Sequence, residues 1–185
     1  MTAVRLLTPL AREALAELRA GQPVLFTGWL YTARDMAHQR LVEALRRGEK
    51  LPFDPRGAVI YYAGPAPARP GEVVGPVGPT TSGRMDPYTP ALLAAGVAAL
   101  IGKGRRSPEV RRALAEHGAI YCAAVGGAAA YLRRFITACE LVAYPDLGPE
   151  AVWRLAVQDF PAVVVNDTRG GDLYEEAAAR YRQKG

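Results

Sequence analysis

One short stretch of the chain, GPTTSGRMD at residues 78–86, combines hydroxyls, a guanidinium and a carboxylate within nine residues. Thr80 and Arg84 are four positions apart, so their side chains share one face if the segment coils into a helical turn. Gly78 and Gly83 allow tight bends and let the backbone approach a ligand closely. The stretch therefore predicts a loop that holds a small anion.

A purely structural interpretation of the same residues is a capped turn. Its hydroxyls would satisfy backbone amides, and Arg84 would lie in solvent. Asp86 before Pro87, or Thr89 before Pro90, would then start the following helix. The residue types alone leave both interpretations open.

A second candidate group lies at the start of a predicted helix, directly after an apolar run of strand formers. Arg34 and His38 are one helical turn apart there, and Asp35 is a possible cap. A strand end that leads into a helix start is a favourable place for an anion. The alternative for His38 is a surface or capping histidine.

Lys103 is the third candidate, because it lies between two glycines at the end of a predicted buried strand. Open α/β sheets place ligand-binding groups at the carboxyl ends of their strands. The alternative is a lysine in an exposed turn.

The elements that position these residues alternate between strand and helix. Strand composition marks 24–32, 58–64, 97–104, 119–125, 140–146 and 160–167. Helical spacing or caps mark 9–19, 33–50, 90–96, 106–118, 128–136 and 172–185. This alternation predicts an α/β fold with a partly parallel central sheet flanked by helices. We expect one domain over 1–185, with a helical segment at 1–20 and the helix at 172–185 peripheral.

Composition narrows the class of protein. The chain has 185 residues, half of them hydrophobic, and suits a single core. No apolar stretch approaches the roughly 20 residues that span a bilayer. The first 21 residues mix Arg and Glu with apolar residues, which is typical of an amphipathic helix and not of a signal peptide. We therefore expect no membrane association and a cytoplasmic location.

The two cysteines, Cys122 and Cys139, lie in separate apolar runs, with no CxxC spacing and neither histidine close in sequence. Metal and iron–sulfur sites need more closely grouped ligands. We expect no metal site made by this chain alone and assign both thiols to packing.

The net charge is +5, and 20 of the 23 basic residues are arginines. Arginine favours bidentate contacts with carboxylates and phosphates, so a small dianion or an acidic protein is a suitable partner. A nucleic acid is a further alternative, through the cluster Arg105, Arg106, Arg111 and Arg112. Because the other basic residues are spread out and no reading motif occurs, we expect no nucleic acid.

Five segments taken together resemble one family, in the same order along roughly residues 21–174. They are TARDMAH at 32–38, LPFD at 51–54, GPTTSGRMD at 78–86, GKG at 102–104 and the AAVGGAAA run. The chain is similar to the β subunit, or C-terminal domain, of iron–sulfur class I fumarate hydratases and L(+)-tartrate dehydratases.

The resemblance implies a swivelling β/β/α domain and the reversible removal of water from a hydroxy dicarboxylate, with fumarate and malate first and tartrate next. It also implies that the 4Fe-4S cluster is bound by a partner α subunit and not by this chain, in an α2β2 heterotetramer. This chain would supply the lid of a shared site.

Residue by residue, the resemblance makes Arg34, Arg84 and Lys103 ligands of the substrate carboxylates, with Thr81 beside them. Thr80 becomes the base at the carbon that loses its proton. The remaining matched residues have supporting roles: Asp35, His38 and Asp86. The competing hypothesis is a non-catalytic module that uses the same loop to bind a small anion or a partner protein.

Overall fold

The structure, a computed structural model, describes residues 2–182. Its strands are β1 (Val4–Leu7), β2 (Pro23–Thr32), β3 (Val59–Tyr61), β4 (Ala99–Gly102), β5 (Ile120–Ala123), β6 (Ile136–Ala143) and β7 (Val152–Asn166). Its α helices are α1 (Arg12–Ala16), α2 (Asp35–Arg46), α3 (Thr89–Ala94), α4 (Pro108–Glu116), α5 (Ala129–Leu132) and α6 (Leu173–Arg182). Three 3₁₀ turns are η1 (Ser82–Met85), η2 (Arg133–Phe135) and η3 (Pro145–Glu150).

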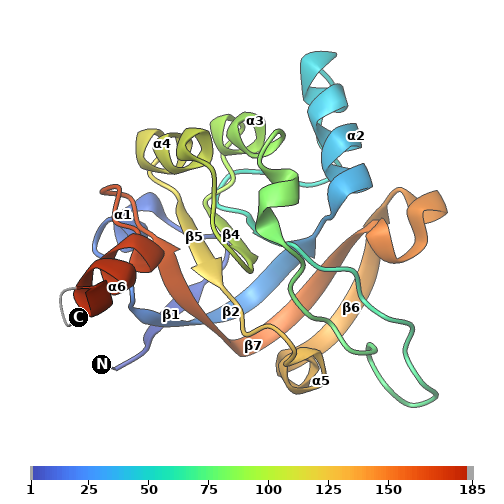
Figure 1. The fold of residues 1–185 in the computed structure, drawn as a ribbon. Coiled ribbons are helices and arrows are strands. Elements are labelled where there is room, and N and C mark those ends of the chain that lie inside the picture. The colour runs from blue at the N-terminus through green and yellow to red at the C-terminus, as the bar shows by residue number, and fades with distance from the viewer. Residues whose placement is uncertain (1, 183–185) are drawn as a thin grey trace.

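The strands form one sheet that closes on itself. Strands β1 to β5 pair with their sequence neighbours in parallel, and β7 runs antiparallel to β2, β5 and β6. Because β7 pairs with both β2 and β5, the strands β2, β3, β4, β5 and β7 form a closed ring (Figure 1). The carboxyl ends of β2 to β5 therefore meet at one edge.

Two separate cores give the molecule its β/β/α layers. Successive residues of β3 and the position after it belong to different cores. Val59 and Tyr61 face the interior of the ring, whereas Ile60 and the following Tyr62 pack with the helical layer. Figure 1 shows α2, α3 and α4 together on one side of the sheet. Since both faces of the strand are buried, its sequence is a continuous apolar run. The α/β fold with a partly parallel central sheet is confirmed.

The first 20 residues differ from the expected helical segment. Val4–Leu7 is a strand that pairs in parallel with β2, and α1 extends only over Arg12–Ala16. Leu6 is buried and Leu7 is exposed, which is the alternation of a half-buried strand. The apolar residues fit both a helical and a strand period over so short a segment, and pairing with β2 selects the strand.

The segment 148–159, expected to separate two strands, contributes most of its residues to β7. This strand runs over 15 residues, bends where Asp159 adopts a positive φ of 52°, and pairs with β2 along most of its length. Its residues Leu155 and Val164 belong to the core inside the ring, whereas Val152 and Val165 belong to the core under the helices. The strand is longer than its apolar stretch because β2 and β6 supply hydrogen bonds on both sides.

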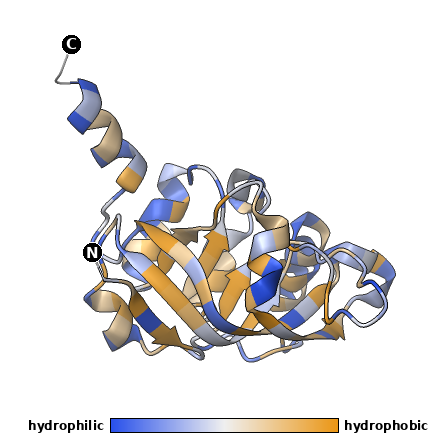
Figure 2. Ribbon diagram, turned by 90° about the horizontal axis from the view of Figure 1, so that it is seen from below, coloured by the Kyte–Doolittle hydropathy of each residue, from blue (hydrophilic) through white to orange (hydrophobic). Residues whose placement is uncertain are grey.

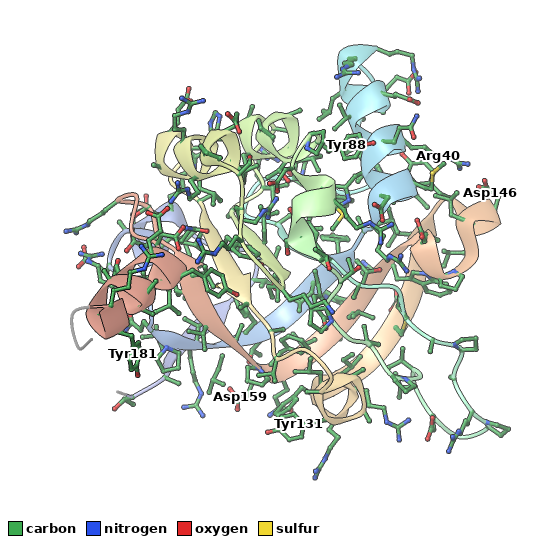
Figure 3. The ribbon with its side chains drawn as sticks, viewed as in Figure 1. Arg40, Tyr88, Tyr131, Asp146, Asp159 and Tyr181 are labelled. Atoms are coloured by element: carbon green, nitrogen blue, oxygen red, sulfur yellow. The ribbon has the colours of Figure 1, made fainter. Side chains whose placement is uncertain are left out.

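Helix α6 projects away from the ring (Figure 2), and none of its residues is buried. Tyr181 points away from the sheet near the end of this helix (Figure 3). The last three positions of the expected helix 172–185 lie outside the described residues. The assignment of one domain to residues 1–185 stays a prediction.

Candidate active site at the carboxyl edge of the parallel strands

Two of the candidate cations follow β2 and β4, the strands on either side of β3, at the same height. Thr32 of β2 pairs with Tyr61 of β3, and Tyr61 pairs with Ile101 of β4. Arg34 and Lys103 each lie two residues beyond these positions. The register of the sheet therefore brings both to one edge, as the position of Lys103 after its strand predicts.

The loop of residues 78–86 enters this edge between β3 and β4. The amide of Thr80 donates to the carbonyl of Tyr62 at 2.7 Å, and the amide of Lys103 donates to the carbonyl of Thr80 at 3.3 Å. The amide of Ser82 in turn donates to the carbonyl of Lys103 at 2.9 Å. Thr80 and Lys103 thus become backbone neighbours although they are far apart in sequence.

Arg84 lies on η1 and contacts the start of α2. Its Nε donates to Oδ1 of Asp35 at 2.8 Å, and its side chain remains 52% exposed. Its terminal nitrogens make no hydrogen bond to residues 2–182. Arg84 is therefore anchored by one nitrogen, while the other two are directed to neither a carboxylate nor a carbonyl of the described chain.

Asp35 does not cap α2, contrary to the possibility that its position suggested. The N-cap position is occupied by Arg34, which makes no side-chain cap, and Asp35 is the first helical residue. Oδ2 of Asp35 is buried without a hydrogen-bond partner among the described residues. The carboxylate instead bridges α2 to Arg84.

Arg34 is held beside η3. Its terminal nitrogen lies 3.2 Å from Oε1 of Glu150, and both side chains are about one-quarter exposed. A Cβ built on Gly64 would lie 3.3 Å from Cδ of Arg34 and 2.7 Å from the carbonyl oxygen of Pro149, so a larger residue would displace the guanidinium. Sequence analysis missed Glu150, because nothing local marks a residue that contacts the site from 116 positions downstream.

His38 is fully buried, so the interpretation as a surface histidine is wrong. Its Nδ1 lies 2.9 Å from the carbonyl oxygen of Arg34, and the edge of its ring packs on Tyr62. Burial lowers the pKa of His38 to about 4. The ring is therefore neutral near pH 7, with Nδ1 as the donor, and it holds the first turn of α2.

Lys103 and Thr81 are exposed at the same edge and form an isolated parallel bridge. A Cβ on Gly126 would lie 3.6 Å from Cδ of Lys103, so the turn after β5 borders this side chain. No ion pair of Lys103 exists within residues 2–182. Gly126 thus borders a cationic side chain.

Asp86 has both carboxylate oxygens engaged away from Thr80. Oδ1 accepts from Nε of Arg106 at 2.7 Å, and Oδ2 accepts from the amide of Ser107 at 2.7 Å. Ser107 also caps α4, with its hydroxyl accepting from the amide of Val110. Within the described chain Asp86 therefore supports the loop and makes no bond to Thr80.

The expected arginine cluster is divided by the fold. Arg106 is buried, Arg111 pairs with Asp172 and Glu175, and Arg112 lies near Glu109. Arg106 and Arg111 are thus tied to acidic side chains of the described chain, whereas Arg105 and Arg112 are exposed. Sequence analysis grouped Arg106 with this cluster and missed its contact with Asp86 near the site.

Comparison with known proteins identifies the family of the chain. The family described as "Fumarase C-terminus" matches residues 1–177. The chain belongs to this fumarase C-terminal family.

Three relatives show how the family is distributed over longer and shorter proteins. "Fumarate hydratase 2" of Leishmania major is 41% identical over 91% of this chain and 30% of its own length. "Fumarate hydratase class I, anaerobic" of Escherichia coli is 40% identical over 89% of this chain and 31% of its own length. "Putative L(+)-tartrate dehydratase subunit beta" of Methanocaldococcus jannaschii is 37% identical over 95% of this chain and 93% of its own length. The chain thus spans about 30% of the fumarate hydratases that it matches.

The thiols of this fumarase C-terminal chain do not fit an iron–sulfur cluster. Cys122 is fully buried in the ring, and Cys139 is half-buried. Burial raises the pKa of both thiols, whereas a cluster binds thiolates. Within residues 2–182 no three His, Cys, Asp or Glu side chains come together as a metal site.

None of the helices within residues 2–182 combines the length and the apolar character that crossing a bilayer demands.

Proposed function

We propose that this member of the fumarase C-terminal family is the β subunit of a hydro-lyase. The reaction is the reversible removal of water from a hydroxy dicarboxylate, with malate and fumarate as the first candidates and tartrate as the next. One observation carries the proposal: Arg34, Thr80, Arg84 and Lys103 meet at the carboxyl edge of the parallel strands, with Arg84 and Lys103 exposed.

The chemistry of dehydration suits these side chains. Removing a proton from the carbon next to a carboxylate moves negative charge onto that carboxylate. Fixed cations that contact it then stabilise the transition state more than the ground state. Arg84 is suited to a bidentate contact, because its Nε is tied to Asp35 and its terminal nitrogens have no partner in the described chain.

Thr80 is the proposed base, through Oγ1. A threonine hydroxyl accepts a proton poorly unless neighbouring cations favour its alkoxide. The carbonyl of Thr80 accepts from the amide of Lys103, so a lysine belongs to the segment that pairs with this loop. The residue opposite Lys103 in the bridge is Thr81. We propose Thr81 as a further ligand of the substrate. Asp35, His38 and Asp86 are proposed to hold the ligand residues in place.

A partner completes the proposed site. Arg84, Lys103 and Thr81 lie on an open face, so a second polypeptide has to enclose the substrate. The similarity to a protein named as a β subunit supports an α partner, to which we assign the 4Fe-4S cluster. The α2β2 assembly and the cytoplasmic location stay predictions.

The decisive experiment is anaerobic co-purification of the tagged chain with its partner from native extract. We expect a second polypeptide with iron and acid-labile sulfide, and turnover of malate, fumarate or L(+)-tartrate in the eluate. The relative kcat/KM values would identify the substrate. A cluster-bearing complex that binds these dicarboxylates without turnover would contradict the enzymatic function and favour the anion-binding module.

A further inference from the structure

Arg106 is a charged side chain buried behind the proposed site. Its guanidinium is fully buried and makes three kinds of contact. Nε donates to Oδ1 of Asp86 at 2.7 Å, one terminal nitrogen donates to the hydroxyl of Tyr62 at 3.1 Å, and the other donates to Oγ1 of Thr89 at 2.8 Å. Burying an arginine is costly unless such partners compensate its charge and its donors.

The donor and the acceptor of each hydrogen bond around Arg106 can be assigned in only one way. Oγ1 of Thr89 donates to the carbonyl of Met85 at 2.9 Å and lies 3.1 Å from the hydroxyl of Tyr62. Since the hydroxyl of Thr89 has only one proton to donate, the hydroxyl of Tyr62 is the donor to Thr89. The Tyr62 hydroxyl in turn accepts from Arg106. Each of the two hydroxyls therefore both donates and accepts.

Aromatic rings enclose the same guanidinium. Its central carbon lies 5.1 Å from the ring centre of Tyr62 and 4.9 Å from that of Tyr121. The hydroxyl of Tyr121 donates to the carbonyl of Gly104 and lies 2.9 Å from Oγ of Ser82, which is thus the donor to Tyr121. A lysine in place of Arg106 has one nitrogen and cannot reproduce this planar fork.

This network contacts every segment of the proposed site. The carbonyl of Tyr62 accepts from the amide of Thr80, and the ring of Tyr62 packs on His38, which bonds the carbonyl of Arg34. Asp86 lies two residues after Arg84. Displacing Arg106 would therefore move the base and both arginine ligands together.

We propose that Arg106 is a positioning residue that fixes the loop of residues 80–89 and, through Tyr62, the start of α2. The inference rests on the proposed function, because the positions of Thr80 and Arg84 affect turnover only if these residues contact the substrate. Within this loop the buried side chains of Ser82 and Thr89 form hydrogen bonds with Tyr121 and Arg106. The side chains of Thr81 and Arg84 are exposed.

The test uses Arg106→Lys and Tyr62→Phe in the assembled enzyme, with Arg112→Lys as the control on α4, the helix that follows Arg106. We expect Arg106→Lys to lower kcat by about 100-fold, the size of loss that a small misplacement of reacting groups causes. Tyr62→Phe removes only one hydroxyl and should lower kcat by roughly 10-fold. Arg112→Lys should match the wild type, since its side chain is exposed.

A second readout does not depend on turnover. Hydrogen exchange of the amides of Thr80 and Arg84 should be at least about 10-fold faster in Arg106→Lys than in the wild type, because fewer bonds hold the loop. If the wild type lacks activity, the proposed function fails while exchange still reports on the loop. Wild-type kcat and wild-type exchange in both variants would overturn the positioning role. So would losses of kcat that disappear at a temperature where each variant is fully folded, since they would reflect stability alone.

Discussion

Nε of Arg84 lies 2.8 Å from Oδ1 of Asp35, two residues that are 49 positions apart in the chain. The contact joins the 3₁₀ turn η1 to the first turn of α2. Only Nε of the guanidinium is hydrogen-bonded to the protein, and the two terminal nitrogens have no partner within residues 2–182. Such a geometry pre-orients an arginine for a carboxylate without neutralising its outer face.

Arg84→Met in the assembled enzyme should lower kcat/KM by roughly 100- to 1000-fold, because it removes a charged donor from the developing charge. Folding should change by less than about 1 kcal/mol, since the lost pair is exposed on the Arg84 side. Steady-state kinetics and urea denaturation measure the two effects. Arg112→Met is the matched control, and near-normal turnover of Arg84→Met would refute the site.

Lys103→Met should lower kcat/KM by about 100-fold, with Lys103→Arg retaining part of the activity through its charge. The side chain is exposed and pairs with no acid in the described chain, so stability should stay within about 0.5 kcal/mol of the wild type. Lys50→Met, at another exposed lysine, serves as the control for loss of positive charge. Equal kinetics for Lys50→Met and Lys103→Met would count against a ligand role.

Acid should destabilise the chain partly through His38. Burial lowers the pKa of His38 to about 4 from 6.5, so between these values the unfolded state binds more protons than the folded state. The stability contribution is complete above pH 6.5 and is lost as the pH falls through about 4; the full shift is worth about 3 kcal/mol.

His38→Asn should therefore flatten the decline of the free energy of unfolding between pH 6.5 and 4.5, measured by urea denaturation. His117→Asn, at the chain's other histidine, is the control and should retain the wild-type slope. A slope unchanged by His38→Asn would show that this ring does not titrate as its burial requires.

Gly102→Ala should destabilise the protein by about 1–3 kcal/mol, as overpacking does. A Cβ there would overlap Oγ of Ser82 and lie 2.9 Å from Cδ2 of Tyr62, so it would push the loop off the sheet. Gly83→Ala is the control, because its Cβ would find its nearest neighbour, the carbonyl oxygen of Arg105, 3.9 Å away. It should change stability by no more than about 0.5 kcal/mol. Thermal melting of the two variants distinguishes them.

Much of the architecture followed from local patterns. The strands predicted at 58–64, 97–104 and 119–125 are apolar on both faces, and the structure buries them between two layers. Where a segment was short or depended on a distant partner, the local pattern failed. The strand Val4–Leu7 exists because β2 pairs with it, and β7 extends through 152–159 because β2 and β6 flank it.

The sequence by itself determined the family and marked the cations Arg34, Arg84 and Lys103 as candidates, since the family motif and these residues can be recognised without coordinates. Only the tertiary structure decided which groups hold them. The pairing of Arg34 with Glu150, and the burial of Arg106 with Asp86, depend on residues that chain topology brings together across long separations. Sequence spacing carries no information on such contacts, because the register of the sheet and the packing of helices on it set the distance between residues remote in sequence.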